Sequence, residues 1–350
     1  MTAASRSSVI RQSGSPLHAM ARPIFLAWMI SFILLGGCAN APKSRGHEQA
    51  FLTPIDALQP APLPANGRLK VVATTNVVAD VVRNVGGSDI ELTPLIPLGA
   101  DPHAYQPTPG DLQALTQADL ILINGLGLEA PLESTLSTLS LDGIPVVSLS
   151  EGVNARDWPM QTDEQHPPDE LLDADLDPHV WLDPLQVIHW TENTQQALSR
   201  RDPVRAETYR QRAQEYQNAL RELHEWILKR VEEIPPARRM LVADHLALGY
   251  FAHRYGFEMV GAVIPAYSTG AEPSSQALGI LQEVIRERDV AAIFVERSLN
   301  PRLAARLAQD VGVPVVPLYI GTLTPPSGEA PSYIAMMQYN VEAIVRALAP

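Results

Sequence analysis

Three histidines in this chain stand next to aspartates in a pattern that could bind a metal ion. His103 and His179 each end the tripeptide Asp-Pro-His, and His245 directly follows an aspartate. Proline restricts its own backbone and that of the preceding residue, so both tripeptides should present their imidazoles from stiff turns. Neutral imidazole is the commonest metal ligand, and a nearby carboxylate can orient it by accepting its second N–H. The repeated pattern therefore predicts that these three histidines bind one metal ion.

A structural role would explain each of the three histidines taken alone, and it is our interpretation of the other six among the nine. An imidazole within a helical pattern is usually solvated or lies at the edge of the core. These six fall in a predicted leader, in the segment after it, in an acidic loop and within helical patterns: His18, His47, His166, His189, His224 and His253.

From residue 69 onward, short apolar runs alternate with helical patterns, which predicts an α/β protein with mostly parallel sheets flanked by helices. The runs predicted as strands are 71–73, 90–92, 120–123 and 146–147, then 240–243, 259–264, 291–295 and 313–318. The stretches predicted as helices are 76–85, 109–116 and 130–139, then 246–255, 274–288, 301–310 and 331–348. Ligands of open α/β sheets gather outside the carboxyl ends of the strands, where His103 and His245 should lie.

A polar stretch from about residue 203 to 233 separates the two halves and predicts one long helix. Asp202 is a suitable N-cap, Pro203 suits the first turn, and the prolines at 235 and 236 end the helix. About thirty residues make a rod of roughly 45 Å, which should join the two lobes rigidly and resist large hinge closure. The apolar positions recur at spacings of three and four, an amphipathic pattern: 209, 213, 216, 220, 223, 227 and 231.

Cys38 is the only cysteine, and it closes the tetrapeptide Leu-Gly-Gly-Cys directly after an apolar run at 24–35. This arrangement resembles the lipobox of bacterial lipoproteins, in which a signal peptidase cuts before the cysteine and the thiol receives a lipid. The run has 12 residues, which suits a signal-peptide core of roughly 7–15 and is too short for a membrane span of about 20. Arginines precede it, and Met20 is an alternative start to Met1; an ordinary buried helix is the structural alternative.

These patterns predict five segments. Residues 1–37 form a signal peptide, 38–68 a lipidated cysteine with a Pro-rich tether, 69–201 an N-terminal α/β lobe, 202–236 the linking helix and 237–350 a C-terminal α/β lobe. Removing the leader removes three arginines and no acid, which changes the formal net charge from −13 to about −16. Such a charge disfavours nucleic acid and anionic membranes as partners and suits a cationic ligand.

Several longer motifs are specific when they occur together. They are GADPHAYQP at 99–107, ADL at 118–120, NG at 124–125, LE at 128–129, DPHVWLDP at 177–184, DHLALGYF at 244–251, YG at 255–256, FVE at 294–296 and MMQYN at 336–340. With these motifs the chain resembles, from residue 71 to 348, the metal-binding solute receptors of bacterial ABC transporters for zinc, manganese and iron, the family called cluster A-I or cluster nine.

The resemblance implies a two-lobed fold joined by a rigid helix, with His103, His179 and His245 as metal ligands. The family's fourth ligand is often an aspartate in the loop after the last strand, and Gly321 occupies that place here. The fourth position is therefore open to water or to another acid. The candidates for a fourth ligand or for a group that supports the ligands are Glu296, Glu329, Asp101 and Asp177.

Three imidazoles without a strong fourth carboxylate favour Zn²⁺, which accepts four-coordinate, nitrogen-rich sites. Mn²⁺, which prefers more oxygen ligands, and Fe²⁺ are the alternatives. The loop from 157 to 177 is acidic and carries one histidine. It is either a solvated loop or a collector that raises the local concentration of divalent cations.

The resemblance also implies an extracytoplasmic, lipid-anchored solute-binding protein, in the periplasm or at the cell surface, that delivers its metal to an ABC transporter permease. We expect a monomer that binds no nucleic acid and is not an enzyme. The sequence contains no Gly-rich, Lys-Ser/Thr phosphate-binding loop. A zinc-dependent hydrolase is one alternative, because a three-histidine site leaves a position open for water. A surface adhesin is the other.

Overall fold

The computed structural model describes residues 48–63, 67–156 and 176–350. The chain divides into two compact units, 1–43 and 44–350, and every described residue belongs to the second. The predicted leader, Cys38, the histidines at 18, 47 and 166, and nearly all of the acidic loop lie outside the described residues. Among the described helices, none combines the length and the apolar character that crossing a membrane requires.

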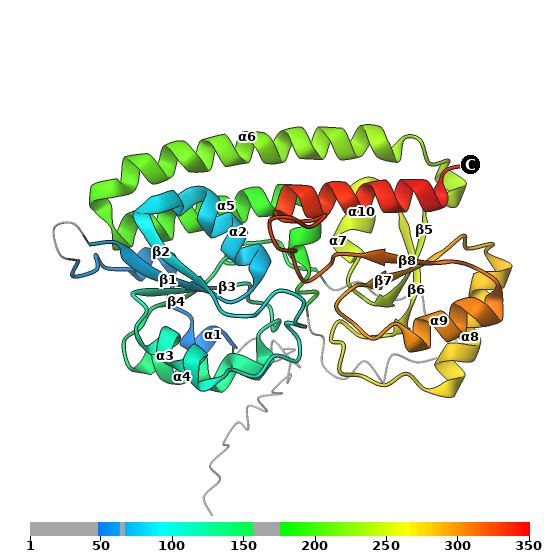
Figure 1. The fold of residues 1–350 in the computed structure, drawn as a ribbon, viewed down its shortest axis with the longest axis horizontal. Coiled ribbons are helices and arrows are strands. Elements are labelled where there is room, and N and C mark those ends of the chain that lie inside the picture. The colour runs from blue at the N-terminus through cyan, green and yellow to red at the C-terminus, as the bar shows by residue number, and fades with distance from the viewer. Residues whose placement is uncertain (1–47, 64–66, 157–175) are drawn as a thin grey trace, which may run out of the picture. The chain divides into compact units, whose positions relative to one another are not determined.

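The first sheet has four parallel strands in the order β2-β1-β3-β4. They are β1 (Leu69–Ala73), β2 (Ile90–Pro94), β3 (Leu120–Ile123) and β4 (Val146–Ser148). Figure 1 shows α2 and α5 on one face of this sheet and α3 and α4 on the other. The helices and short 3₁₀ turns of this half are α2 (Asn76–Gly86), η2 (Gly87–Asp89), α3 (Pro109–Thr116), η3 (Ala130–Leu132), α4 (Glu133–Leu141), η5 (Val180–Leu182) and α5 (Pro184–Arg201).

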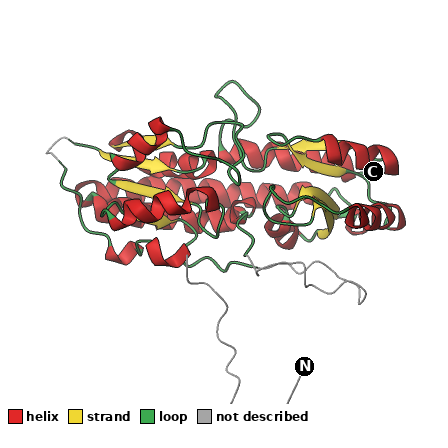
Figure 2. Cartoon of the chain, turned by 90° about the horizontal axis from the view of Figure 1, so that it is seen from below, coloured by secondary structure: helices red, strands yellow, loops and turns green. Residues whose placement is uncertain are grey.

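The second sheet repeats this order, with four parallel strands arranged β6-β5-β7-β8. They are β5 (Met240–His245), β6 (Glu258–Ile264), β7 (Ile293–Glu296) and β8 (Val315–Leu318). The helical elements of this half are η7 (Pro236–Arg238), α7 (Gly249–Tyr255), α8 (Ser275–Glu287), α9 (Arg302–Val311) and α10 (Tyr333–Leu348). The two groups of strands are separate in both views (Figures 1 and 2). The prediction of two parallel sheets flanked by helices is confirmed.

Side-chain alternation along the strands sorts the core into three clusters. On one face of both sheets, residues such as Val71 and Leu122 in the first and Ala243 and Phe294 in the second belong to one continuous cluster with α2, α5, α6, α7 and α10. The opposite faces have separate clusters, one with α3 and α4 and one with α8 and α9. The prediction of two lobes therefore holds for the sheets, but the larger part of the core is shared between them.

One long helix, α6 (Ala206–Val231), follows the turn η6 (Pro203–Arg205) and packs against α2, α5 and α10. Figure 1 shows it running along both sheets. Asp202 does not cap it with its side chain, because that carboxylate accepts hydrogen bonds from Arg205 and from the Tyr209 hydroxyl instead. The apolar positions expected from the sequence are all buried: Tyr209, Ala213, Tyr216, Leu220, Leu223, Ile227 and Val231.

Helix α5 was not among the predicted helices. It begins with Asp183 as N-cap, whose carboxylate accepts the Leu185 N–H, and with Pro184 in the first position. That pair is a recognisable helix start. The buried side chains of α5, including Val187 and Trp190, pack in the shared cluster beneath α6.

The described part of the predicted tether differs from an extended spacer. It contains α1 (Glu48–Phe51) and the turn η1 (Ile55–Ala57), and Phe51, Ile55 and Leu58 are buried against the first half. Backbone hydrogen bonds join this segment to β4 and to the end of α5. The prolines suggested an extended chain, but the apolar side chains among them are large enough to pack against the first half. The exact limits of the predicted segments remain a prediction.

Candidate metal centre

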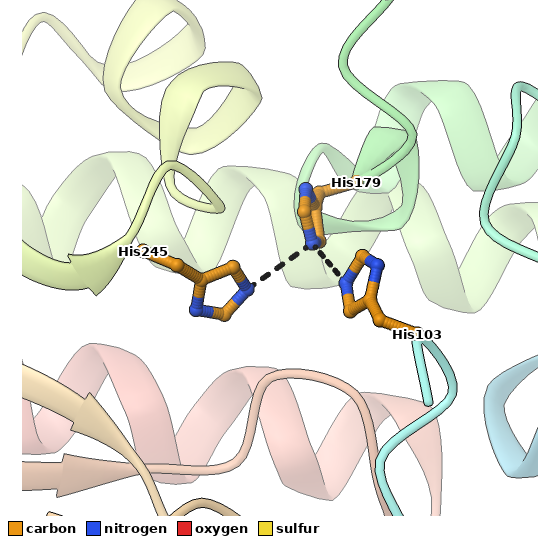
Figure 3. A group of neighbouring side chains, drawn as sticks. All are labelled: His103, His179 and His245. Atoms are coloured by element: carbon orange, nitrogen blue, oxygen red, sulfur yellow. Dashed lines mark hydrogen bonds between the residues drawn. The ribbon is translucent and has the colours of Figure 1, made fainter. Parts of the chain in front are cut away.

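The three predicted histidines come from three different parts of the chain (Figure 3). His103 lies in the loop that follows β2, His179 directly precedes η5, and His245 is the last residue of β5. Parallel strands place their carboxyl ends at one edge of a sheet. His245 therefore faces the first half from the end of the second sheet, and the loop after β2 brings His103 to the same point.

The Nε2 atoms of these imidazoles face one another. The Nε2 of His179 lies 3.1 Å from that of His103 and 3.3 Å from that of His245. Among the described residues, they are the one group of three or more His, Cys, Asp or Glu side chains that could hold a metal ion, and their candidate ligand atoms all lie within 4.8 Å of one another. Zn–N bonds of about 2.0–2.1 Å at tetrahedral angles would separate neighbouring nitrogens by about 3.3–3.4 Å. The spacing therefore suits one shared cation.

Carboxylates fix two of the three rings. Asp177 Oδ1 accepts the backbone N–H of His179 at 2.9 Å and lies 2.8 Å from its Nδ1. Asp244 Oδ1 does the same for His245, with both distances 2.8 Å. Because an ionised carboxylate oxygen can only accept, we assign the ring proton to the Nδ1 that faces it. In the neutral imidazoles the lone pairs then lie on the two facing Nε2 atoms, which is the arrangement that a bound cation would satisfy.

Two of the three histidines are buried, and burial favours the neutral form of all three imidazoles. His179 and His245 are only 1% and 0% exposed. Burial, together with the charges of the neighbouring imidazoles, holds the pKa of His103 and of His179 well below the ordinary value. Burial also opposes the charged form of His245, but the hydrogen bond and charge of Asp244 raise its pKa above that value. Two of the three rings are therefore neutral and ready to bind a cation at neutral pH.

Glu296 is the last residue of β7, which pairs with β5, the strand that ends at His245. Its Oε1 accepts hydrogen bonds from the Gly321 N–H at 2.8 Å and from the Ser298 hydroxyl at 2.6 Å. Its backbone N–H donates to Asp244 Oδ2 at 2.6 Å. Burial raises the pKa of this carboxyl group, against the lowering effect of the charge on His245. Glu296 thus supports the aspartate that orients His245.

The other predicted acids have different positions. Asp101 Oδ1 accepts the backbone N–H of His103 at 2.9 Å, and Asp177 orients His179 as described above. Glu329 is exposed and pairs with Arg297 and the Tyr319 hydroxyl, each at 3.2 Å, so the structure does not bring it into the histidine group.

The remaining described histidines lie outside the group, in helices. The ring of His189 bonds to the Glu151 carbonyl through Nε2, and that of His224 to the Tyr255 hydroxyl through Nδ1. His253 is exposed on α7.

Sequence reasoning missed the residues that reach the site from the opposite half. The Thr269 hydroxyl donates to Asp101 Oδ2 at 2.5 Å, and the Thr322 hydroxyl accepts the Gly99 N–H at 2.8 Å. Trp181 Nε1 donates to the Ile320 carbonyl at 2.8 Å. The two threonines stand in ordinary loop sequence, so no local pattern singles them out.

Two parallel sheets that share a core, with buried imidazoles from both halves facing one another, define the class of two-lobed solute-binding proteins with a metal site. The family described as zinc-uptake complex component A, periplasmic (ZnuA), matches residues 71–347. The chain belongs to this family, whose members are metal-binding substrate-binding components of ABC transporters and not enzymes.

Relatives with different metals in their names resemble the chain to a similar degree. The manganese-binding lipoprotein MntA of Halalkalibacterium halodurans is 34% identical over 281 residues, covering 80% of this chain and 88% of the relative. The zinc-binding protein TroA of Treponema pallidum is 33% identical over 291 residues, covering 81% and 90%.

Solved structures show the same fold. The periplasmic zinc-binding protein TroA from Treponema pallidum matches with a TM-score of 0.72 and 31% identity, covering 81% of this chain and all of that one. The Mn-bound periplasmic metal-binding protein from Candidatus Liberibacter asiaticus matches with a TM-score of 0.67 and 25% identity, covering 79% and 98%.

Ring titration of the metal-free protein tests the charge state of the site. Between about pH 8 and pH 5, NMR should show no protonation of His179 near the ordinary value of 6.5, because burial holds its pKa well below that value. His245 should protonate above 6.5, because Asp244 outweighs the effect of burial. If His179 and His245 both titrated at the pKa that histidine shows in the urea-unfolded protein, this electrostatic description would be contradicted.

Proposed function

We propose that this chain captures Zn²⁺ between its two halves and delivers it to the permease of an ABC transporter. The observation that carries the proposal is the group formed by His103, His179 and His245, with Nε2 separations of 3.1 and 3.3 Å. A ligand set drawn from both halves makes metal binding depend on how the halves are held together. A protein that must later release its cargo benefits from that dependence.

Zinc is the metal that the donor atoms favour. Three neutral nitrogens suit a four-coordinate Zn²⁺ whose remaining position holds water or a carboxylate oxygen. Mn²⁺ and Fe²⁺ are the alternatives, and Mn²⁺ would gain from more oxygen ligands than this group offers. Glu296 Oε1, which accepts the Gly321 N–H, is the acid next to the place of the family's aspartate. Names of relatives support both zinc and manganese.

The proposed setting is outside the cytoplasm. The family is described as periplasmic, and several relatives are named lipoproteins. Together with the sequence around Cys38, this supports a protein anchored to a membrane through a lipid on that cysteine, acting as a monomer. Its proposed partners are the metal ion and the membrane permease.

Neither of the other functions considered has an observation of its own. A zinc hydrolase would use the same three histidines with a bound water, but the family consists of solute-binding components. An adhesin would need an exposed surface suited to a partner, and the histidine group, in which two of the three rings are buried, is not such a surface.

Replacing one ligand tests the proposal. His179→Ala should weaken zinc binding by more than about 100-fold, because it removes the central imidazole of the group. His253→Ala, which removes an exposed imidazole on α7, is the matched control and should bind zinc like the unaltered protein. The measurement is a competition titration with a chelator of known affinity, which should also give one zinc ion per chain. Unchanged affinity in His179→Ala would refute the site.

A second pair of variants tests the basis of metal choice at Gly321. A Cβ at this position would lie 3.0 Å from Glu296 Oε1 and 3.2 Å from Pro102 Cδ. Gly321→Asp should shift the preference from Zn²⁺ toward Mn²⁺ in a competition titration, because it adds oxygen ligands. Gly321→Ala brings the same crowding without the carboxylate, so it should leave the preference unchanged. An equal shift in both variants would mean that packing, and not the added oxygen, sets the choice.

A further inference from the structure

The three histidines are not held in the same way. His179 and His245 are almost completely buried, and an aspartate bonds the Nδ1 of each ring. His103 is only partly buried, and among the described residues no carboxylate bonds its ring. Its position therefore depends on the backbone of its loop more than the positions of the other two ligands do.

Asp101 holds that backbone and is itself held from the opposite half. Its Oδ1 accepts the His103 N–H at 2.9 Å, as Asp177 Oδ1 does for His179. The two aspartates then differ. The oxygen of Asp177 also bonds the ring of its histidine, whereas Oδ2 of Asp101 accepts the Thr269 hydroxyl at 2.5 Å.

Thr269 lies in the loop between β6 and α8, and this loop is tied to the end of β5. The Leu246 N–H, directly after His245, donates to the Ala266 carbonyl at 2.9 Å. A second contact between the halves reaches the same His103 loop, because the Gly99 N–H donates to the Thr322 hydroxyl at 2.8 Å. The loop that carries His103 is thus fastened to the half that carries His245.

We propose that Thr269 is a positioning residue, which holds Asp101, and through it His103, at the metal site only while the two halves are together. This inference rests on the proposed function. Separation of the halves breaks the bond between Thr269 and Asp101, and His103 loses the support that fixes its loop. His179 and His245 keep their own aspartates. Opening therefore removes the support of His103 while it draws His245 away from His179, which lets the cargo leave without protonating a buried imidazole.

Zinc release measures this role directly. The zinc-loaded protein is mixed with an excess of a colorimetric chelator, and the dissociation rate is followed by stopped flow. Thr269→Val keeps the shape of the side chain but removes the hydroxyl, and it should release zinc about tenfold faster, as expected for one hydrogen bond to a carboxylate. Thr269→Ser restores the hydroxyl and should release zinc close to the original rate.

Thr138→Val is the matched control. The hydroxyl of this exposed threonine on α4 donates to the Ser134 carbonyl of its own helix, far from the histidines in the fold, so its loss should leave the rate unchanged. Equal dissociation rates for Thr269→Val and the unaltered protein would overturn the inference. So would a Thr269→Val variant that loses the same thermal stability with and without zinc, because the hydroxyl would then serve only the fold. If the unaltered protein bound no zinc, the proposed function itself would fail, which is a separate result.

A double-mutant cycle tests whether Thr269 acts through Asp101. Asp101→Ala should itself accelerate zinc release, because it frees the His103 N–H. Adding Thr269→Val to that variant should then produce no further acceleration, since the contact is already lost. Additive effects of the two substitutions would show that Thr269 influences the site by another route and would contradict the inference.

Discussion

The structure around the site depends on one constraint, which is that the Nε2 atoms of two buried imidazoles must face each other at close range. His179 and His245 direct their Nε2 atoms at each other across 3.3 Å, and their Nδ1 protons are committed to Asp177 and Asp244. Once both rings are neutral, their facing lone pairs repel each other unless a cation lies between them; a proton on His245, whose pKa Asp244 raises, is the alternative when no metal is bound. Burial keeps His179 uncharged, and the carboxylates prevent the rings from turning away. The surrounding fold has to hold these two ligands, which come from opposite halves, close together.

The fold does so by sharing its core between two similar sheets. One continuous cluster covers one face of both sheets, and α6 packs against helices of both halves. Polar contacts reinforce the junction. Asp80 on α2 accepts the Tyr333 N–H at the start of α10, and the Tyr333 hydroxyl donates to the Trp181 carbonyl near the site. Metal binding by such a protein requires only small movements at the junction of the two halves. At that junction, the hydrogen bond from Thr269 to Asp101 decides whether His103 is positioned to bind the metal.

Two of the proposed metal-binding histidines, α6 and most strands could be predicted from the sequence, because each is marked by a pattern of residues close together in the chain. The repeated Asp-Pro-His pointed to His103 and His179, and the spacing of apolar residues located α6 and the strands. Helix α5 was missed although Asp183 and Pro184 mark its start. The packing of Phe51 and Ile55 was hidden by the prolines around them. The contact of Thr269 with Asp101 joins residues 168 positions apart, and only the fold brings them together. The role of Glu296 beside Gly321 likewise depends on strand order.

X-ray absorption spectroscopy of the zinc-loaded protein is the decisive measurement of the three-histidine site, because it counts the atoms around the metal and identifies them. We expect a first shell with three imidazole nitrogens at about 2.0–2.1 Å and one light atom, oxygen or nitrogen, completing four-coordination. A shell made only of oxygen atoms, or one with fewer than three imidazoles, would contradict a cation shared by His103, His179 and His245.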